Sequence, residues 1–432
     1  MHNSKNLTLR EAGVTLIDCD HRTPPAVEFG YPYVTIPQMK EGRLDLASAR
    51  RIEPAHFKEW TRKALPEAND VVLSRRCNPG ETAYVPLGVE FALGQNLVLL
   101  RADGKKVYPP FLRWLVRGDE WWNQINKNLN VGAVFDSLRC ADVPKFELTI
   151  PPLPEQRAIA SVLGALDDKI ESNRRTSRAL ERLARAIFRA WFVDFEPVKA
   201  KAAGASSFPG MPQEAFDALP SRLVESELGM VPESWEVGTM GAIGIQKRSQ
   251  LQANRIAPGT AYIGLEHMPR HSIALSEWGT ADSIESAKSE FEKGDILFGK
   301  LRPYFHKVGI APLNGVCSTD IVVLSPKKTE AAAWLTMVVS SDEFVSHANQ
   351  TSAGTKMPRT NWKDMANFPI VIPASIVRDA YQQLFEPVIG IIHHGISESH
   401  KLASFRDYIL PKLLSGQVRV SDTKESLGVV SQ

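Results

Sequence analysis

The sequence predicts an α+β protein made of two similar globular mixed α/β domains, each followed by a long helix. Two observations support this prediction. The segment 146–152, which ends in two prolines, has a counterpart at 368–374, an offset of 222 positions (368 minus 146). The apolar positions after each copy then keep matching without a gap. One structural unit built twice predicts a molecule with pseudo-two-fold symmetry.

The first long helix is predicted from the spacing of its apolar residues. They recur at steps of three and four from Glu155 to Phe192, while Arg and Glu fill the other positions. At about 1.5 Å per residue, such a helix is more than roughly 50 Å long. The matched pairs are Ile159/Tyr381, Val162/Leu384, Leu163/Phe385, Leu166/Val388, Ile170/Ile392, Leu180/Leu402, Leu183/Phe405, Ile187/Ile409 and Phe188/Leu410.

The second helix has a weaker sequence. Pro387, Gly390 and Gly395 interrupt it, and each of them destabilises a helix or favours a kink. We expect a bent helix that ends near Pro411 and is held by packing against the first helix.

The regions before the two helices also resemble each other. Strands are expected at Tyr31–Ile36, Asp70–Leu73 and Asn96–Leu100, and an amphipathic helix at Phe111–Trp122. The matching segments are Tyr33–Met39 with Tyr262–Met268, Asp70–Arg75 with Asp295–Lys300, Asn96–Leu100 with Asp320–Leu324, and Trp114 with Trp334.

These matches divide the chain into six parts. We expect a first domain at 1–151, a first long helix at 152–196, a second domain at 228–373, a second long helix at 374–416 and a tail at 417–432. The part between the first helix and the second domain, 197–227, begins with a stretch rich in Ala, Gly, Ser and Pro. That composition predicts a linker or an exposed excursion.

Composition excludes some classes of protein. The net charge of +2 is too small to indicate a nucleic-acid partner by itself, so any basic surface must be local. The four cysteines lack metal-type spacing, which favours reduced thiols. Neither a signal segment nor a membrane-spanning run is present in the sequence, so we expect a cytoplasmic protein without a membrane partner.

Three patterns resemble chemical motifs but lack their requirements. Gly294–Lys300 has the glycine and lysine spacing of a phosphate loop, but its central residues form a strand and Leu301 replaces the hydroxyl residue. Tyr108–Phe111 lacks the Asn of the methyltransferase motif that it resembles. His393 and His394 point to different faces of a helix. We therefore predict no catalytic, cofactor-binding or metal-binding residues in this chain.

Several segments resemble the specificity subunits of type I restriction–modification systems. Ile150–Ala160, Leu166–Ile170 and Ala190–Phe195 resemble the first repeat region of that family, and Leu228–Trp235 resembles the opening of its second recognition domain. Lys356–Trp362 and Leu410–Gly416 resemble its end. The second copy departs from the pattern, because Ala374–Arg378 replaces the Pro-Leu-Pro-Glu-Gln of the first.

The resemblance implies a non-catalytic DNA-specificity subunit. Two target-recognition domains, held apart by an antiparallel, coiled-coil-like pair of helices, would read the two halves of an asymmetric split site in double-stranded DNA. Two modification subunits, which carry S-adenosylmethionine and the adenine methyltransferase activity, would dock on the helices. Two restriction subunits, which use ATP and Mg²⁺, would complete the enzyme.

Base reading in the major groove requires Arg, Lys, Asn or Gln on protruding loops. The candidate DNA-binding residues are Arg75, Arg76 and Asn78 in the first domain, and Lys300, Arg302 and Lys307 at the equivalent place in the second. The loops at Asn130–Ala133 and Thr355–Arg359 lie at matching positions and add Lys356 and Arg359. For each residue the alternatives are a phosphate contact or a solvated surface charge.

The predicted helix-pair and partner interface follows the duplicated apolar positions. It comprises Leu163, Leu166, Ile170, Leu180, Leu183, Ile187, Phe188, Trp191, Phe192, Phe385, Ile392, Leu402, Phe405 and Ile409. We expect Phe188, Trp191 and Phe192 to stay exposed and to bind a protein partner. The alternative is that these rings pack onto the chain's own domains.

Two other functions remain open from the sequence. The chain could serve a complex that only methylates DNA, or it could be a structural protein that scaffolds a protein dimer without binding DNA. An autonomous enzyme is disfavoured by the missing catalytic motifs.

Overall fold

The computed structural model describes residues 4–132 and 136–420. Its contacts divide the chain into two compact units. Unit 1 comprises the residues up to Asp168 and those from Lys401 on, and unit 2 comprises Lys169–His400. Each unit therefore contains part of both long helices.

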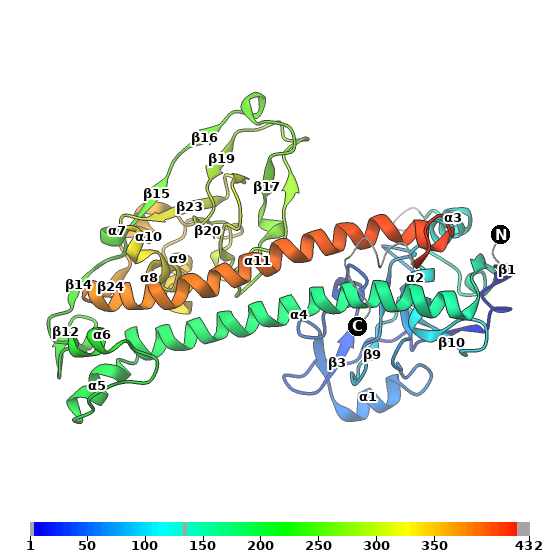
Figure 1. Cartoon of the computed structure of the whole chain (residues 1–432), viewed down its shortest axis with the longest axis horizontal. Coiled ribbons are helices and arrows are strands. Elements are labelled where there is room, and N and C mark those ends of the chain that lie inside the picture. Colours follow the sequence, from blue (N-terminus) through cyan, green and yellow to red (C-terminus); the bar gives the residue numbers. More distant parts are fainter. Residues whose placement is uncertain (1–3, 133–135, 421–432) are drawn as a thin grey trace. The chain divides into compact units, whose positions relative to one another are not determined.

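The two long helices are α4, Leu153–Phe192, and α11, Ser375–Leu414, of 40 residues each (Figure 1). The first agrees with the prediction. The second continues through Pro387, and it ends beyond the expected end near Pro411. Pro387 is exposed, so the carbonyl group that it leaves without an N–H partner can be solvated.

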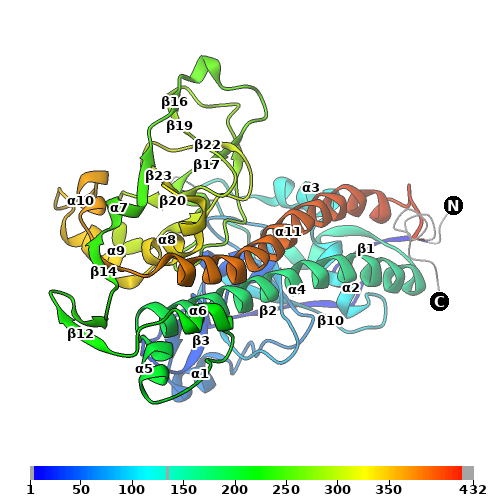
Figure 2. The same ribbon diagram turned by 60° about the vertical axis from the view of Figure 1, so that its left-hand side comes forward.

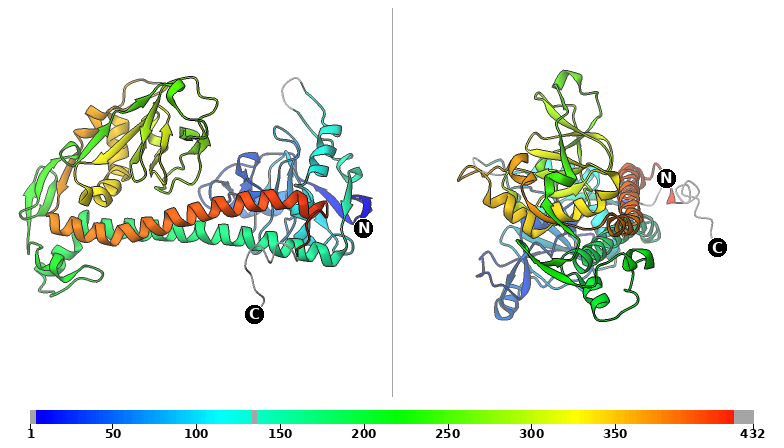
Figure 3. Two further views of the ribbon diagram at one scale, coloured as in Figure 1. Left: turned by 45° about the horizontal axis from the view of Figure 1, so that its top comes forward. Right: turned by 90° about the vertical axis from the view of Figure 1, so that its left-hand side faces the viewer.

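Within unit 2, equivalent positions of the duplicated helices contact each other. Asn173 Nδ2 donates to the carbonyl oxygen of Gly395 at 3.3 Å, and Gly395 lies 222 positions after Asn173. Farther along, Tyr381 Oη donates to the carbonyl oxygen of Ala184 at 2.9 Å, which makes the two segments antiparallel (Figure 3, left). Equivalent positions of the duplicated helices therefore meet beside Asn173.

Within unit 1, a buried carboxylate holds the helix segments together. Asp167 on α4 accepts a hydrogen bond from Arg406 Nη1 on α11 at 2.6 Å, and both side chains are buried. Arg43 Nη2 lies 3.5 Å and Arg113 Nη1 3.8 Å from the same carboxylate. One buried acidic group therefore links both helices to the globular part of unit 1.

The main sheet of unit 1 has the order β2-β10-β7-β8, with all neighbours antiparallel. Its strands are β2 Val14–Asp18, β10 Leu97–Ala102, β7 Val71–Ser74 and β8 Thr82–Tyr84. Alternate residues of β7 and β10 face two different cores. The first core also contains Leu163 of α4 and Ile409 of α11, and the second contains Phe91. Burial on both faces explains why these strands are continuously apolar.

Three smaller sheets are present among the described residues of unit 1, and the smallest is the antiparallel pair β4 and β5. Another has the order β6-β3-β9, with β3 parallel to β9, and the third pairs β1 with β11. These strands are β1 Lys5–Thr8, β3 Tyr31–Val34, β6 Arg50–Ile52, β9 Ala92–Leu93 and β11 Glu147–Ile150. Shorter elements are β4 Met39–Lys40, β5 Arg43–Leu44, α1 Pro54–Trp60 and 3-10 turns at Ile36–Gln38 and Val143–Lys145.

The main sheet of unit 2 has the same strand order as that of unit 1, and the second sheet of unit 2, whose strands β16, β19, β22 and β17 are labelled in Figure 2, has two further strands. The main sheet has the order β15-β23-β20-β21, and the second sheet the order β16-β19-β22-β17-β18, with β17 parallel to β22. β14 pairs with β24 as β1 pairs with β11. The strands are β14 Glu236–Thr239, β15 Gly244–Lys247, β16 Gln250–Leu251, β17 Ala261–Ile263, β18 Gly279–Thr280, β19 Lys288–Phe291, β20 Ile296–Gly299, β21 Val308–Ile310, β22 Gly315–Cys317, β23 Ile321–Pro326 and β24 Pro369–Ile372.

The prediction of a single helix at Phe111–Trp122 is wrong. The structure has two helices there, α2 Pro109–Leu115 and α3 Asp119–Asn128, with Gly118 as the N-cap residue of the second. Unit 2 has the same break between α8 Ala332–Val339 and α9 Asp342–Gln350. The predicted equivalence of Trp114 and Trp334 is confirmed, since both rings are buried on corresponding helices. Shorter elements of unit 2 are α7 Met240–Ile243, α10 Trp362–Ala366 and 3-10 turns at Ala253–Arg255, Leu265–His267, Pro303–Phe305 and Thr329–Ala331.

The prediction of a linker or exposed excursion at 197–227 is also wrong. The structure has helices α5 Glu196–Ala202 and α6 Gln213–Asp217 there, and the strand β12 Leu223–Ser226 pairs with β13 Gly229–Pro232. Val198, Met211 and Phe216 are buried in the main core of unit 2. The small residues between these anchors gave the segment its linker-like composition.

The aromatic residues predicted to remain exposed are buried. Phe188, Trp191 and Phe192 are 8%, 2% and 7% exposed. Their rings contact Tyr381 of α11, and Phe192 also packs near Trp235. The end of α4 therefore forms part of the core of unit 2 rather than a free surface. Conversely, Leu183 is 52% exposed and does not belong to the seam between the helices.

The other predicted interface residues face the interior to different extents. Leu163, Leu166, Ile170, Phe385, Ile392 and Ile409 are buried, and Leu180, Ile187, Leu402 and Phe405 are partly buried. No helix among residues 4–132 and 136–420 is long and apolar enough to cross a membrane.

We predict that Asp167→Asn destabilises the protein by about 3–5 kcal/mol, because it removes the buried counter-charge of Arg406 and leaves this guanidinium only the exposed carboxylate of Asp407. Urea unfolding measures the change. The matched control is Asp168→Asn at the exposed neighbouring position, which should change stability by less than about 0.5 kcal/mol. Equal effects of both variants would contradict a structural role of the buried carboxylate.

A second prediction concerns His393 on α11. Burial, with the nearby Lys293, lowers the pKa of His393 from 6.5 to about 4. Between pH 6.5 and about pH 4 the unfolded chain therefore binds a proton that the folded chain does not bind. The free energy of unfolding consequently decreases as the pH is lowered through this range. His393→Gln should remove about 2 kcal/mol of the stability loss between pH 7.5 and pH 5. Urea unfolding at both pH values, with His394→Gln as the exposed control, tests this; an unchanged loss would contradict it.

Candidate functional site

Each unit brings three polar segments together at the ends of its main-sheet strands. In unit 1 the first loop cluster consists of Arg75–Asn78 after β7, Gln95–Asn96 before β10, and the pair Asn130 and Ser137. In unit 2 the second loop cluster consists of Lys300–Arg302 after β20, Ser318–Asp320 before β23, and residues 353–359.

Backbone hydrogen bonds fix the first loop cluster. The N–H of Arg75 donates to the Asn96 carbonyl at 2.9 Å, and the N–H of Leu138 donates to the Arg75 carbonyl at 2.8 Å. Arg76 forms a bridge with Ser137, which also exchanges two hydrogen bonds with Asn130.

The second loop cluster uses the same connections. The N–H of Lys300 donates to the Asp320 carbonyl at 2.9 Å, and the N–H of Thr360 donates to the Lys300 carbonyl at 3.1 Å. Leu301 forms a bridge with Arg359, which exchanges two hydrogen bonds with Ala353. The two units thus share one backbone frame, and the side chains that it presents differ.

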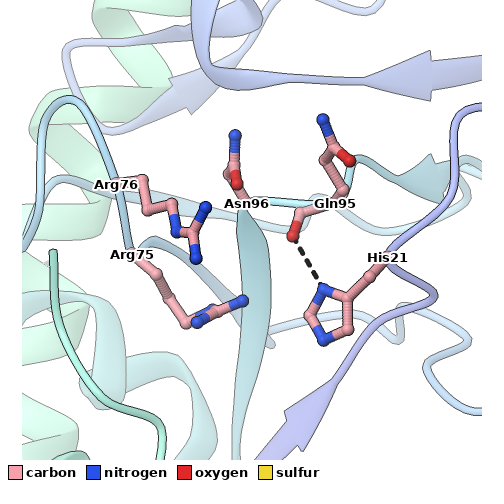
Figure 4. A pocket seen from close by; sticks show the side chains of 5 residues that line it. All are labelled: His21, Arg75, Arg76, Gln95 and Asn96. Carbon is pink, nitrogen blue, oxygen red and sulfur yellow. Dashed lines mark hydrogen bonds between the residues drawn. The ribbon is translucent and has the colours of Figure 1, made fainter. Parts of the chain in front are cut away.

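The side chains of the first loop cluster line an open recess (Figure 4). His21, Arg75, Arg76, Gln95 and Asn96 form its lining, which contains two guanidinium groups and two amides but lacks a carboxylate. Among the described residues, Arg75 Nε is buried without a hydrogen-bond partner. His21 is fixed by its two ring nitrogens, which lie 3.0 Å from the Gln95 carbonyl and 3.0 Å from Asp18.

The second loop cluster differs from the first because it contains a carboxylate, that of Asp320, beside its cationic side chains. Arg359 Nε lies 3.3 Å from Asp320 Oδ1, and both side chains are partly exposed. Arg302 has a left-handed backbone (φ 50°), and its N–H donates to the Pro358 carbonyl at 2.7 Å. Here cationic groups surround a carboxylate, so this cluster offers an acceptor that the first lacks.

The structure therefore brings together most of the predicted DNA-binding residues. Arg75, Arg76 and Asn78 lie on one loop of unit 1, and Lys300, Arg302, Lys356 and Arg359 lie in one cluster of unit 2. Lys307 is the exception. It lies close to β21, and its ammonium group donates to the Leu265 carbonyl. Burial lowers the pKa of Lys307. Ala133, at the end of one predicted loop, lies outside the described residues.

Sequence reasoning missed four residues whose side chains this site uses: His21, Gln95, Asn96 and Asp320. The match between Asn96–Leu100 and Asp320–Leu324 contained a usable signal. It aligns Asp320 with Asn96 directly before the two equivalent strands, where side chains project from the end of the sheet. No comparable signal marks His21, which reaches the recess from the segment after β2.

Among the described residues, two groups of three could hold a metal ion: Asp18, Cys19 and His21 in unit 1, and His271, His306 and Asp342 in unit 2. In the first group, burial raises the pKa of Cys19 to about 12, and its thiol donates to the Gly94 carbonyl. A protonated thiol is a poor metal ligand, so this group does not fit an ion.

Residues 25–182 match the family model described as the type I restriction modification DNA specificity domain. The type I restriction enzyme MjaIX specificity subunit of Methanocaldococcus jannaschii is 24% identical over 393 residues, which cover 86% of this chain and 83% of the relative. The EcoDI specificity subunit of Escherichia coli is 25% identical over 332 residues, which cover 74% and 72%.

The fold is similar to that of the type I restriction-modification system S subunit from M. genitalium. The two structures align with a TM-score of 0.56 and 14% identity, over 95% of this chain and 96% of the other.

The structure predicts that Cys77 is the most reactive thiol. Cys77 is exposed on the loop of the first cluster, Cys140 is partly buried, and Cys19 and Cys317 are buried. Burial raises the pKa of the Cys19 and Cys317 thiols to about 12, so their thiolate fractions are negligible at neutral pH. Maleimide labelling followed by mass spectrometry should modify Cys77 first, and Cys77→Ser should remove the fast phase. Fast labelling that persists in this variant would contradict the position of the loop.

Proposed function

We propose that this chain, which belongs to the type I restriction–modification specificity subunits, reads a bipartite and asymmetric site in double-stranded DNA. One half of the site would be read by each loop cluster. The observation that carries the proposal is the repeated backbone frame: equivalent hydrogen bonds hold both clusters, but the side chains presented by them differ. A repeated frame supports two half-sites, and different side chains support different sequences.

The chemistry of each cluster fits base reading. Arginine can bind the O6 and N7 atoms of guanine with two hydrogen bonds, and Asn or Gln can bind adenine in the same way. The first loop cluster carries both types, at Arg75, Arg76, Gln95 and Asn96. Asp320 gives the second cluster an acceptor suited to the amino group of cytosine, while Arg359 and Lys300 supply donors.

We further infer that the long helices dock the modification subunits. In place of the buried aromatic residues, the exposed apolar side chains Leu183, Ile391 and Tyr408 are the docking candidates on α4 and α11. S-adenosylmethionine, ATP and Mg²⁺ would then be bound by the partner subunits, and this chain would contribute sequence selection alone.

The two alternative functions make different predictions. A dimer scaffold would not select a DNA sequence, even together with a modification subunit. A subunit of a methylation-only complex would select the same DNA site but would not support cleavage when a restriction subunit is added. Selection of DNA from a random pool by the chain with its modification subunit separates the first alternative from the proposal. Recovery of no sequence motif would contradict DNA reading.

The half-site assignment gives a sharper prediction. Arg76→Ala should relax base choice in one half-site, and Lys300→Ala should relax it only in the other. Loss of one base contact costs about 1–3 kcal/mol, which corresponds to about a 5- to 150-fold loss of discrimination. The two variants are controls for each other, and Arg10→Ala, at an exposed position outside both clusters, controls for the loss of one positive charge. Sequencing of selected DNA gives the result, and relaxation of both half-sites by one variant would contradict the assignment.

Protection of Cys77 offers a second readout of the same site. Its maleimide labelling should slow in the complex when DNA that contains the selected motif is added, and it should slow less with a scrambled motif. Equal labelling rates with both DNA molecules would place Cys77, and with it the loop of the first cluster, away from the bases.

A further inference from the structure

A group of three potential metal ligands lies in unit 2, on segments that the proposed DNA reading does not use. His271 precedes β18, His306 follows the 3-10 turn Pro303–Phe305, and Asp342 is the first residue of α9. One ligand atom of each residue lies within 4.8 Å of the other two. His306 is 4% exposed, while His271 and Asp342 are exposed.

The tautomer of His306 is set by its backbone partner. His306 Nε2 lies 3.1 Å from the carbonyl oxygen of Ser340. A carbonyl oxygen can only accept, so Nε2 carries the proton and the neutral ring has its lone pair on Nδ1. Metal-binding histidines are commonly oriented in this way, by donation of the second ring nitrogen to a carbonyl or carboxylate oxygen.

The lone pair on Nδ1 faces a second acceptor. His306 Nδ1 lies 3.2 Å from Asp342 Oδ1. Two acceptors at this distance repel each other unless a proton or a metal cation lies between them. In tetrahedral zinc sites the metal–ligand bonds are about 2.0–2.2 Å, which places neighbouring ligand atoms roughly 3.3 Å apart.

The rings of His271 and His306 are 4.3 Å apart between centroids, so the third ligand is already adjacent. A metal ion placed between His306 Nδ1 and Asp342 Oδ1 would therefore also be within reach of a ring nitrogen of His271.

The groups behind His306 are rigidly connected. The Ser340 carbonyl also accepts from Arg185 Nη1 at 3.0 Å, and Arg185 Nη2 donates to Glu181 at 2.9 Å. Glu181 in turn accepts from the backbone N–H of Ile273 at 2.9 Å, two residues after His271. Hydrogen bonds to Arg185 and Glu181 of α4 therefore hold the segments that carry the potential ligands in place.

We propose that His271, His306 and Asp342 form a binding site for a divalent transition-metal ion of the zinc class. Two imidazoles and one carboxylate suit such an ion, and water would fill the remaining position on the exposed side. The ion would join the segment before β18, the Pro303–Phe305 turn and the start of α9. It would have a structural role.

The site has no equivalent in unit 1 among the described residues. Asp119, the first residue of α3, corresponds to Asp342, the first residue of α9. Asp119 is not part of the potential metal-binding group of unit 1, which lies at Asp18, Cys19 and His21. The ion would therefore act in unit 2 alone, where one of the three joined segments is the turn that follows the second loop cluster. Arg302 and His306, which flank this turn, both have left-handed backbones, with φ of 50° and 51°. Holding two such strained residues in place is a suitable task for a metal ion.

Cobalt(II) provides a direct test on the full chain. After treatment with a chelator and its removal, Co²⁺ is titrated and the visible absorption of the bound ion is recorded. We expect one equivalent to bind with the intense d–d bands of a tetrahedral site, to be displaced by Zn²⁺, and to raise the melting temperature. His271→Ala should weaken binding by about 100-fold or more, and because His271 is exposed, the variant should fold.

Asp342→Asn should likewise weaken Co²⁺ binding, while Asp119→Asn, at the equivalent position of unit 1, should not. Cys19→Ser tests the other group. The proposal is overturned if no stoichiometric Co²⁺ binds, if binding is unchanged in His271→Ala, or if the absorption shows thiolate ligation that is lost in Cys19→Ser. These outcomes do not depend on DNA, so they are independent of the proposed reading function.

Discussion

The packing of α4 and α11 into both units is the interaction on which the rest of the structure depends. In unit 1, Leu163 of α4 and Ile409 of α11 lie in the same core as the main-sheet residue Leu73. In unit 2, Phe188 of α4 and Tyr381 of α11 lie in the same core as Phe298 of the main sheet. Neither globular part completes its core from its own strands. Because the burial of these side chains is the main favourable term in folding, each unit needs both helices.

This dependence explains why the duplication is best preserved in the helices. A helix that must fill the core of a sheet domain at one end and contact its own copy near Asn173 has few free positions. The loop clusters have different requirements, because their geometry is set by backbone hydrogen bonds that every residue type except proline can make. Thus Arg76 and Leu301, or Ser137 and Arg359, occupy the same bridges in the two units. Such a frame allows side chains to change without loss of the loop conformation, which supports the proposed reading of two different half-sites.

The sequence correctly predicted the repeated helices and strands. It did not predict features that depend on contacts with residues distant in sequence. The offset of 222 located α4, α11 and the pair of strands β11 and β24, because long periodic segments are defined by their own pattern. The same pattern places Phe188 on the apolar face of α4 but does not predict which residues bury it. Tyr381 and the segment after α4 bury this ring, and that segment was predicted to be a linker. Its anchors, Val198 and Phe216, are separated by small residues, so composition averaged over the segment hid them.

The candidate site shows the same division. The match of Asp70–Arg75 with Asp295–Lys300 placed the first loop of each cluster correctly, since a loop that follows a predicted strand inherits its position. His21 and the ion pair of Arg359 with Asp320 depend on tertiary contacts between segments far apart in sequence. Lys307 looked equivalent to the other cations, but its ammonium group is held by the Leu265 carbonyl. A cation that is already paired with the chain's own backbone must lose that hydrogen bond before it can contact a phosphate or a base. Lys307 is therefore better suited to holding the loop before β21 than to the DNA reading that we propose for the second loop cluster.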